Sequence, residues 1–264
     1  MTDGQSIHGF REWVDEEPNP SWKFLPLTHI TKCITGEAVI KSGNIRASWC
    51  SVFETTRAYF FYGRPSYRVH GDGPIKVAAA CPMCFILDGI LLSNASDIYA
   101  FDTGAHASRM YDHALLKEIP KEEFNLMSAE RVNRLIAKVF GSLDRYFLGE
   151  TDKIRKEGLV ENWQFASSAF LDLITSRGRN EPDDRISAIE VSFDSDVEFV
   201  PHLKAIVVPD SIYGLGSKAP WLEELADAGC EVAPYKFRPG RNADYYYALI
   251  EAEVTDMYRR WRLI

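Results

Sequence analysis

An acidic residue, Glu190, interrupts the run RISAIEVSFD at residues 185–194, whose β-branched and aromatic residues are typical of a strand. Because alternate side chains of a strand share a face, Glu190 lies with Ala188 and Ser192 and apart from the apolar residues between them. The pattern therefore predicts that Glu190 is outside the core, so a solvated strand face explains it without any chemistry. Its small neighbours leave room for a ligand, however, and the charged loop SRGRNEPDDR before the strand is of a type that often carries binding sites.

Two motifs nearer the N-terminus also bring polar and aromatic groups together. LTHIT contains Thr28 and His29, and a histidine there is more often a core or capping residue than a catalytic one. YFFYGRPSYR places Arg64 among the tyrosines Tyr59, Tyr62 and Tyr67. Such tyrosines commonly pack in a core, but an arginine among them could hold a phosphate while an aromatic ring stacks on a planar ligand.

The remaining candidate motifs favour structural interpretations. Cys81 and Cys84 have the spacing of half a zinc ribbon or of a redox pair, but no second CxxC occurs, so we expect two buried thiols. His106, Asp112 and His113 could bind a metal, but a polar connecting loop explains them better. We expect no metal site.

The bulk composition limits the class of protein. Its 264 residues, 46% hydrophobic and 12% aromatic, suffice for a sizeable core, and no apolar run approaches the length of a membrane span. The acidic N-terminus lacks the pattern of a signal peptide, and the five cysteines suit a reducing compartment, so we expect a cytoplasmic protein with no membrane partner. A net charge of −8 disfavours broad adhesion to nucleic acid but allows a local basic site such as the tail YRRWRLI.

The hydrophobic periodicity predicts one α+β domain over residues 1–264, with an irregular arm at 1–22. Helices are expected at about 31–41, 128–147, 159–175, 219–230 and 242–261. Gly43 is expected to end the first of these helices and Ser128 to cap the second. Strands are expected in AYFFYGRPSYRV, CFILDGILL, DIYAF, RISAIEVSFD, HLKAIVV and EVAPYKF.

Taken in order, LTHIT, AYFFYGRPSYRV, the polar loop with RISAIEVSF, and HLKAIVVPDSI resemble an ADP-ribosyltransferase of the PARP-like type. The resemblance is nearest to the DarT-type toxins that modify nucleic acid, and it covers about half of the chain. It implies a split β-sheet core with flanking helices and a helical insertion at about residues 72–160. The run GRPSYR departs from the family's usual continuation, which leaves open which arginine acts and which acceptor is used.

The resemblance also implies a role for each candidate residue. Glu190 would be the catalytic carboxylate, with Arg64 orienting a phosphate or the substrate. His29 would hold the ribose of the nicotinamide half of NAD. The further positions implied to bind the cofactor are Thr28, Tyr59, Tyr62 and Tyr67. The loop that faces the acceptor would contribute Arg177, Arg179, Asp183, Asp184 and Arg185.

Three functions follow as alternatives. The first is a mono-ADP-ribosyltransferase, a toxin or defence effector that uses NAD as a substrate to modify DNA or RNA and is paired with an antitoxin protein. The second is a transferase that modifies a protein side chain, which the acidic net charge favours while the loop arginines do not. The third is a binding protein that retains the fold without the activity.

Overall fold

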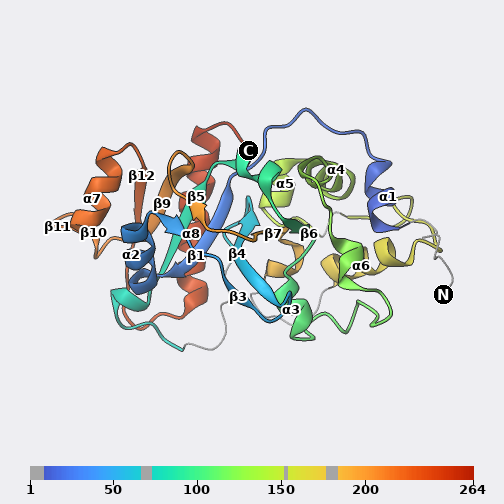
Figure 1. Cartoon of the computed structure of the whole chain (residues 1–264), viewed down its shortest axis with the longest axis horizontal. Helices are drawn as coiled ribbons and strands as arrows, with labels where there is room; N and C mark the ends of the chain where they lie inside the picture. Colours follow the sequence, from blue (N-terminus) through green and yellow to red (C-terminus); the bar gives the residue numbers. More distant parts are fainter. Residues whose placement is uncertain (1–8, 67–72, 152–153, 177–183) are drawn as a thin grey trace.

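A central mixed β-sheet with helices around it organises the chain (Figure 1). The computed structural model describes residues 9–66, 73–151, 154–176 and 184–264, with Asp184 and Arg185 described in their backbone alone. The sheet order is β12-β9-β5-β1-β4-β7-β6, and β3 pairs with the far end of β4. The strands are β1 Leu27–Lys32, β3 Ser48–Cys50, β4 Thr55–Tyr62, β5 Pro82–Leu87, β6 Asp97–Tyr99, β7 Glu190–Phe193, β9 Leu203–Pro209 and β12 Glu231–Tyr235. Short pairs are formed by β2 Asn44–Ile45 with β8 Val197–Glu198 and by β10 Tyr213–Gly214 with β11 Ser217–Lys218.

The sheet has a narrow junction between β1 and β4. β1 pairs with β5 over its whole length, from Leu27 opposite Leu87 to Lys32 opposite Pro82. It pairs with β4 only through Leu27 and Thr28, after which the two strands are no longer in register with each other. The hydrogen-bonded sheet is thus continuous rather than split, but the two halves are joined through a short ladder just before His29.

Helices cover the two halves of the sheet separately (Figure 1). The long helix α8 (Ala243–Arg260) packs along β5, β9 and β12, while α2 (Cys33–Ser42) lies against β1 and β5 and contacts α7 (Pro220–Asp227). At the other end, α1 (Phe10–Asp15) packs on α4 (Ala129–Phe140) and α6 (Phe165–Thr175). The short helices α3 (Thr103–Ala107) and α5 (Leu143–Phe147) complete the helical part. No helix in the described ranges is both long and apolar enough to cross a membrane.

The expected α+β character is confirmed, and several local predictions hold. Gly43 ends α2 in the left-handed conformation with φ 72°, and the Ser128 side chain caps α4. The helix expected over 128–147 is instead two helices, because Gly141 adopts φ 78° and Ser142 caps α5 anew. The helix expected from residue 159 begins only at Phe165.

Two larger expectations need correction. The N-terminal arm is not wholly irregular: it contains α1, whose Phe10, Trp13 and Val14 are fully buried. The region 72–160 is not simply a helical insertion, because it supplies β5 and β6 to the central sheet. β5 lies between β1 and β9 and every one of its residues is buried, so this region is part of the core.

Candidate functional site

One row of side chains runs across the sheet just beyond the narrow junction. Thr28 on β1 lies opposite Phe61 on β4, Phe61 lies opposite Glu190 on β7, and Glu190 lies opposite Tyr99 on β6. Directly paired residues of neighbouring strands point to the same face, so these four side chains share one side of the sheet. Strands lie about 4.8 Å apart, which places Thr28 about 10 Å from Glu190.

Glu190 itself is buried, contrary to the expectation of a solvated face. Its side chain is 5% exposed, and Ala188 and Ser192 beside it are equally enclosed. The cover is the start of α3, where the Thr103 hydroxyl donates a 2.6 Å hydrogen bond to Glu190 Oε1 and the Thr103 backbone N–H donates at 3.2 Å to Oε2. Both carboxyl oxygens are therefore held by one residue. The small neighbours do not make an open space, because the chain itself fills it.

The environment raises the pKa of Glu190 to about 8, first because burial penalises the charged form and second because Asp102 lies nearby. The two hydrogen bonds from Thr103 act in the opposite direction, since they stabilise the ionised carboxylate. Asp102 is itself buried and caps α3 by accepting a hydrogen bond from the Ala105 N–H. A carboxyl with a pKa near the working pH can exchange its proton during a reaction, which suits acid–base chemistry.

His29 lies on β1 just beyond the last pair that this strand makes with β4. Its Nδ1 is 2.8 Å from the backbone carbonyl oxygen of Tyr59, and since a carbonyl can only accept, Nδ1 carries the proton. Burial lowers the pKa of His29, so the ring is neutral and Nε2 is unprotonated at pH 7. The imidazole thus offers a hydrogen-bond acceptor. Because His29 alternates with Thr28 along β1, however, it points with Tyr62 to the face opposite Glu190, and its ring lies 5.7 Å from that of Phe60. This placement does not bring His29 together with Glu190, contrary to the ribose-binding role that the resemblance implies.

Arg64 follows β4 and is only 4% exposed. Its guanidinium donates to the hydroxyl of Ser187, in the turn that leads into β7, and its backbone oxygen accepts a 2.7 Å hydrogen bond from Thr28 Oγ1. A Cβ on Gly149 would lie 2.8 Å from the guanidinium, so the loop after α5 also packs against it closely. Arg64 therefore joins the ends of β1, β4 and β7 around the candidate site.

The tyrosines do not act as a group. Tyr59 is half-buried, lies on the same face as Glu190, and donates its hydroxyl to Cys50 Sγ at 2.7 Å. Tyr62 points to the opposite face and is fully buried, with its hydroxyl between the Leu25 N–H and the Asn133 side chain. Its ring therefore belongs to the core and is not available for stacking on a ligand, which corrects the role inferred from the sequence. Tyr67 lies outside the described residues.

Most of the expected acceptor loop lies outside the described residues. Arg177, Arg179 and Asp183 lie outside the described residues, while Asp184 and Arg185 belong to a 3₁₀ turn over Asp184–Ser187. This turn leads directly into β7, which agrees with the predicted order of loop and strand.

The residue that sequence reasoning missed is Thr103. It lies within FDTGAH, and the only local signal was the Asp102–Thr103 pair, which is typical of a helix N-terminus. Nothing local shows that this helix start lies over Glu190, 87 positions away in the chain.

The candidate metal ligands gain no support from the described part of the chain, where no cluster of histidine, cysteine and acidic residues could hold a metal ion. Cys81 and Cys84 are buried free thiols, as expected. Burial raises the pKa of Cys81 to about 11, so this thiol is protonated.

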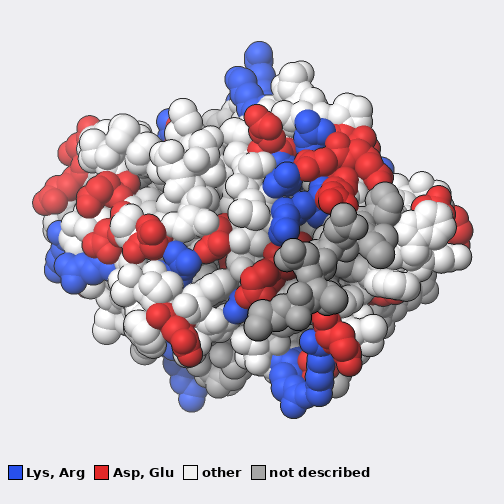
Figure 2. All heavy atoms as spheres, turned by 45° about the vertical axis from the view of Figure 1, so that its right-hand side comes forward, with Lys and Arg blue, Asp and Glu red and all other residues white. Residues whose placement is uncertain are grey.

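Charge is mixed over the face that carries α1, α4 and α6. Figure 2 shows basic and acidic side chains interleaved there, and ion pairs such as Arg131–Asp15 and Lys138–Glu16 account for part of this pattern. This face therefore does not present a broad basic surface.

A comparison with protein-family models gives no match for this chain, and a comparison with curated proteins gives no significant match either.

Proposed function

We propose that the protein is an NAD-dependent mono-ADP-ribosyltransferase of the PARP-like type that modifies a nucleic acid. The observation that carries the proposal is the placement of Glu190: a buried carboxyl with a pKa of about 8, in one row with Thr28 and next to the junction at which His29 lies. The order of these motifs in the sequence, and the narrow junction where the family's sheet divides, support the same proposal.

The chemistry assigns each group a step. The bond between nicotinamide and C1′ of the ribose breaks, and nicotinamide leaves with the bonding electron pair. The positive charge that develops on the ribose is stabilised by ionised Glu190 through a hydrogen bond to a ribose hydroxyl. The acceptor then forms a bond to C1′, and its proton passes to Glu190 or to solvent.

The face around Glu190 supplies the rest of the site. Tyr59 and Phe61 lie on this face and offer aromatic surface for the nicotinamide ring, while Tyr62 does not. Arg64 acts through the ends of the strands that it joins. Each ionised carboxyl oxygen of Glu190 accepts one hydrogen bond from Thr103 and keeps a second lone pair, which a ribose hydroxyl would use while Thr103 stays in place.

The test is NAD cleavage by purified protein, measured as nicotinamide release with single-stranded DNA, RNA, duplex DNA and protein offered as acceptors. Glu190→Gln keeps the size of the side chain and should lower the rate on the order of 10²–10³-fold. Glu198→Gln, an exposed glutamate on β8, is the matched control and should retain the full rate. Equal rates for wild type and Glu190→Gln on every acceptor would overturn the proposal. Modification of protein alone would show that the acceptor is a protein and not a nucleic acid.

A further inference from the structure

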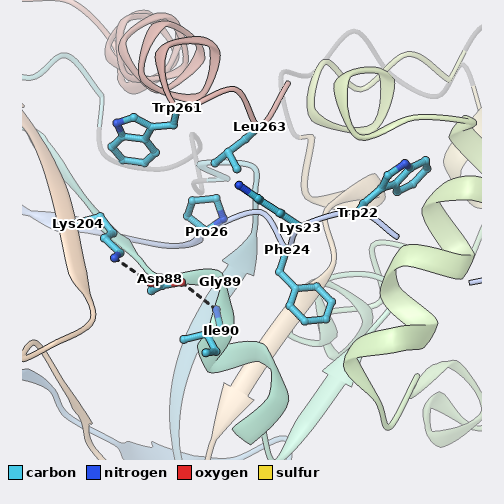
Figure 3. Close-up of a pocket in the computed structure, with 10 residues that line it drawn as sticks. All are labelled: Trp22, Lys23, Phe24, Pro26, Asp88, Gly89, Ile90, Lys204, Trp261 and Leu263. Carbon is cyan, nitrogen blue, oxygen red and sulfur yellow. Dashed lines mark hydrogen bonds and ion pairs between the residues drawn. The ribbon is translucent and has the colours of Figure 1, made fainter. Parts of the chain in front are cut away.

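A cavity of about 720 Å³ lies away from Glu190, at the end of the sheet where the chain enters β1 (Figure 3). Its walls come from four places: the segment before β1, the turn after β5, the start of β9 and the C-terminus beyond α8. Its volume is that of a typical small-ligand site. The residues that determine its chemistry are Trp22, Lys23, Phe24, Asp88, Lys204 and Trp261.

Three aromatic side chains contribute to the walls of this cavity. Trp22 and Phe24 come from the segment before β1, and Trp261 comes from the end of α8. Figure 3 shows the two indoles on opposite sides of the cavity in this view. Both tryptophans are only partly buried, so their rings can receive a planar group. Every nucleobase has a flat π face and can stack on such rings, whatever its sequence.

The charges favour an anionic ligand. Lys204 forms a 2.9 Å ion pair with Asp88, but Lys23 has no ion pair within the described part of the chain and reaches into the centre of the cavity in Figure 3. Arg259 and Arg262, on either side of Trp261 in the basic tail, also form no ion pair among the described residues. A base stacked on one of these indoles, with its phosphate near Lys23, satisfies both properties.

The position of the cavity links it to the candidate site. Pro26 lines the cavity and accepts a hydrogen bond from the Gly63 N–H, next to Arg64. Thr28 and His29 follow Pro26 by two and three residues, and a strand rises about 3.3 Å per residue, so the cavity wall lies on the order of 10 Å from the narrow junction beside the candidate site. This distance suits a nucleotide that neighbours the modified one in the same strand.

We propose that this cavity binds a base and its phosphate from the single-stranded part of the acceptor, at a position flanking the modified nucleotide. The inference rests on the proposed function for its biological meaning. The binding of nucleic acid to this cavity can, however, be measured without NAD and without catalysis.

The experiment measures the affinity of fluorescent oligonucleotides for the full chain in the absence of NAD. Trp261→Ala should weaken binding of a single strand by about 5- to 150-fold, the range expected for loss of one base–aromatic contact. Lys23→Ala should weaken it less and should reduce the slope of log affinity against log salt by about 0.7. Trp163→Ala, at a tryptophan that is 54% exposed and outside the cavity, is the matched control and should bind as wild type does.

Several results would overturn the proposal. One is unchanged affinity in Trp261→Ala and Lys23→Ala while wild type binds the oligonucleotide; another is no binding by wild type at all. Equal affinity for a free mononucleotide and for the oligonucleotide would also exclude single-stranded nucleic acid as the ligand of this cavity. Because Trp261→Ala could disturb α8, Lys23→Glu provides a second variant on the exposed segment before β1, and it should abolish binding while circular dichroism stays unchanged.

Failure of this proposal can be told apart from failure of the proposed function. If Glu190→Gln abolishes NAD cleavage while the cavity variants bind oligonucleotide normally, the enzyme assignment stands and the cavity does not. If the cavity variants lose binding while no protein cleaves NAD, the cavity stands as a nucleic-acid site and the enzymatic proposal falls.

Discussion

Thr103 is the residue on which the chemistry of Glu190 depends most directly. Its hydroxyl and its N–H hold the two carboxyl oxygens, and both bonds lower the pKa of Glu190 against the effect of burial. A hydrogen bond to a charged group contributes roughly 1.5–3 kcal/mol, so Thr103→Val should slow NAD cleavage by about 10- to 100-fold at neutral pH. Without the Thr103 hydroxyl the pKa of Glu190 is higher. Since the reaction uses ionised Glu190, the pH at which activity rises should therefore be higher in this variant than in wild type.

The control for that change is Thr103→Ser, which keeps the hydroxyl. It should restore most of the rate and the wild-type pH profile, measured as kcat for nicotinamide release between pH 6 and pH 10. A purely structural role would reduce both variants through stability alone and would leave the pH profile in place. That result would remove Thr103 from the mechanism.

Glu190 also makes stability depend on pH. Its pKa of about 8 in the folded protein exceeds the ordinary glutamate pKa of 4.5, so the folded protein holds a proton that the unfolded chain releases. This contribution to stability is complete below about pH 4.5 and is lost as the pH rises through 8. Glu190→Gln removes the charge, so the variant should be more stable than wild type by about 3–5 kcal/mol at pH 9 and nearly equal to it at pH 4.5.

Urea unfolding at the two pH values measures this difference. Glu198→Gln should show no such pH-dependent gain. A constant difference between wild type and Glu190→Gln from pH 4.5 to pH 9 would mean that Glu190 ionises normally.

At the scale of elements, the segment before β1 is fixed by an unusually close backbone contact. Gly89, which begins the 3₁₀ helix over Gly89–Asn94, lies so near that a Cβ on it would stand 2.4 Å from the backbone oxygen of Leu25. Backbone atoms cannot yield as a flexible side chain can, so Gly89→Ala should cost about 2–4 kcal/mol of stability. It should also disturb the cavity, which Gly89 lines.

Gly43→Ala is the comparison for that change, since its Cβ would meet nothing and only the left-handed backbone with φ 72° opposes it. We expect a cost of about 1 kcal/mol there. Thermal or urea unfolding of both variants decides the matter. Equal costs would show that the segment before β1 moves away freely.

The elements also show what could be predicted from the sequence. Ser128 and Gly43 act locally, within one turn of the backbone, and their caps were predicted correctly. Period-two alternation correctly put Glu190 on a different face from Val191, yet it could not predict burial, because the cover comes from Thr103 on a distant segment. The stacking role predicted for Tyr62 was wrong for the same reason. The sequence pattern of a strand indicates which face a tyrosine occupies, but not which elements pack over that face.

At the scale of the whole molecule, one hydrophobic core joins the N-terminal helix to the C-terminal one. The buried cluster extends from Phe10 and Trp13 to Met257 and Tyr258, and it includes β5 from the region that the sequence resemblance left unassigned. The strands, the helices and the candidate site are therefore stabilised by one hydrophobic core. The inclusion of α1 in this core could not be predicted from the sequence, because α1 has only six residues and its apolar positions are too few to establish a helical period.

Trp13→Ala tests this shared core. Trp13 is fully buried, and its indole N–H donates a 2.7 Å hydrogen bond to the Leu159 carbonyl, so the change leaves a cavity and an unpaired acceptor. We expect a loss of about 3–5 kcal/mol, seen as a single shifted transition both in circular dichroism and in tryptophan fluorescence. Trp163→Ala, at an exposed tryptophan, should stay within about 0.5 kcal/mol of wild type. Two separate transitions, with only the first shifted by Trp13→Ala, would show that the helical end with α1, α4 and α6 unfolds apart from the sheet and that the site does not depend on it.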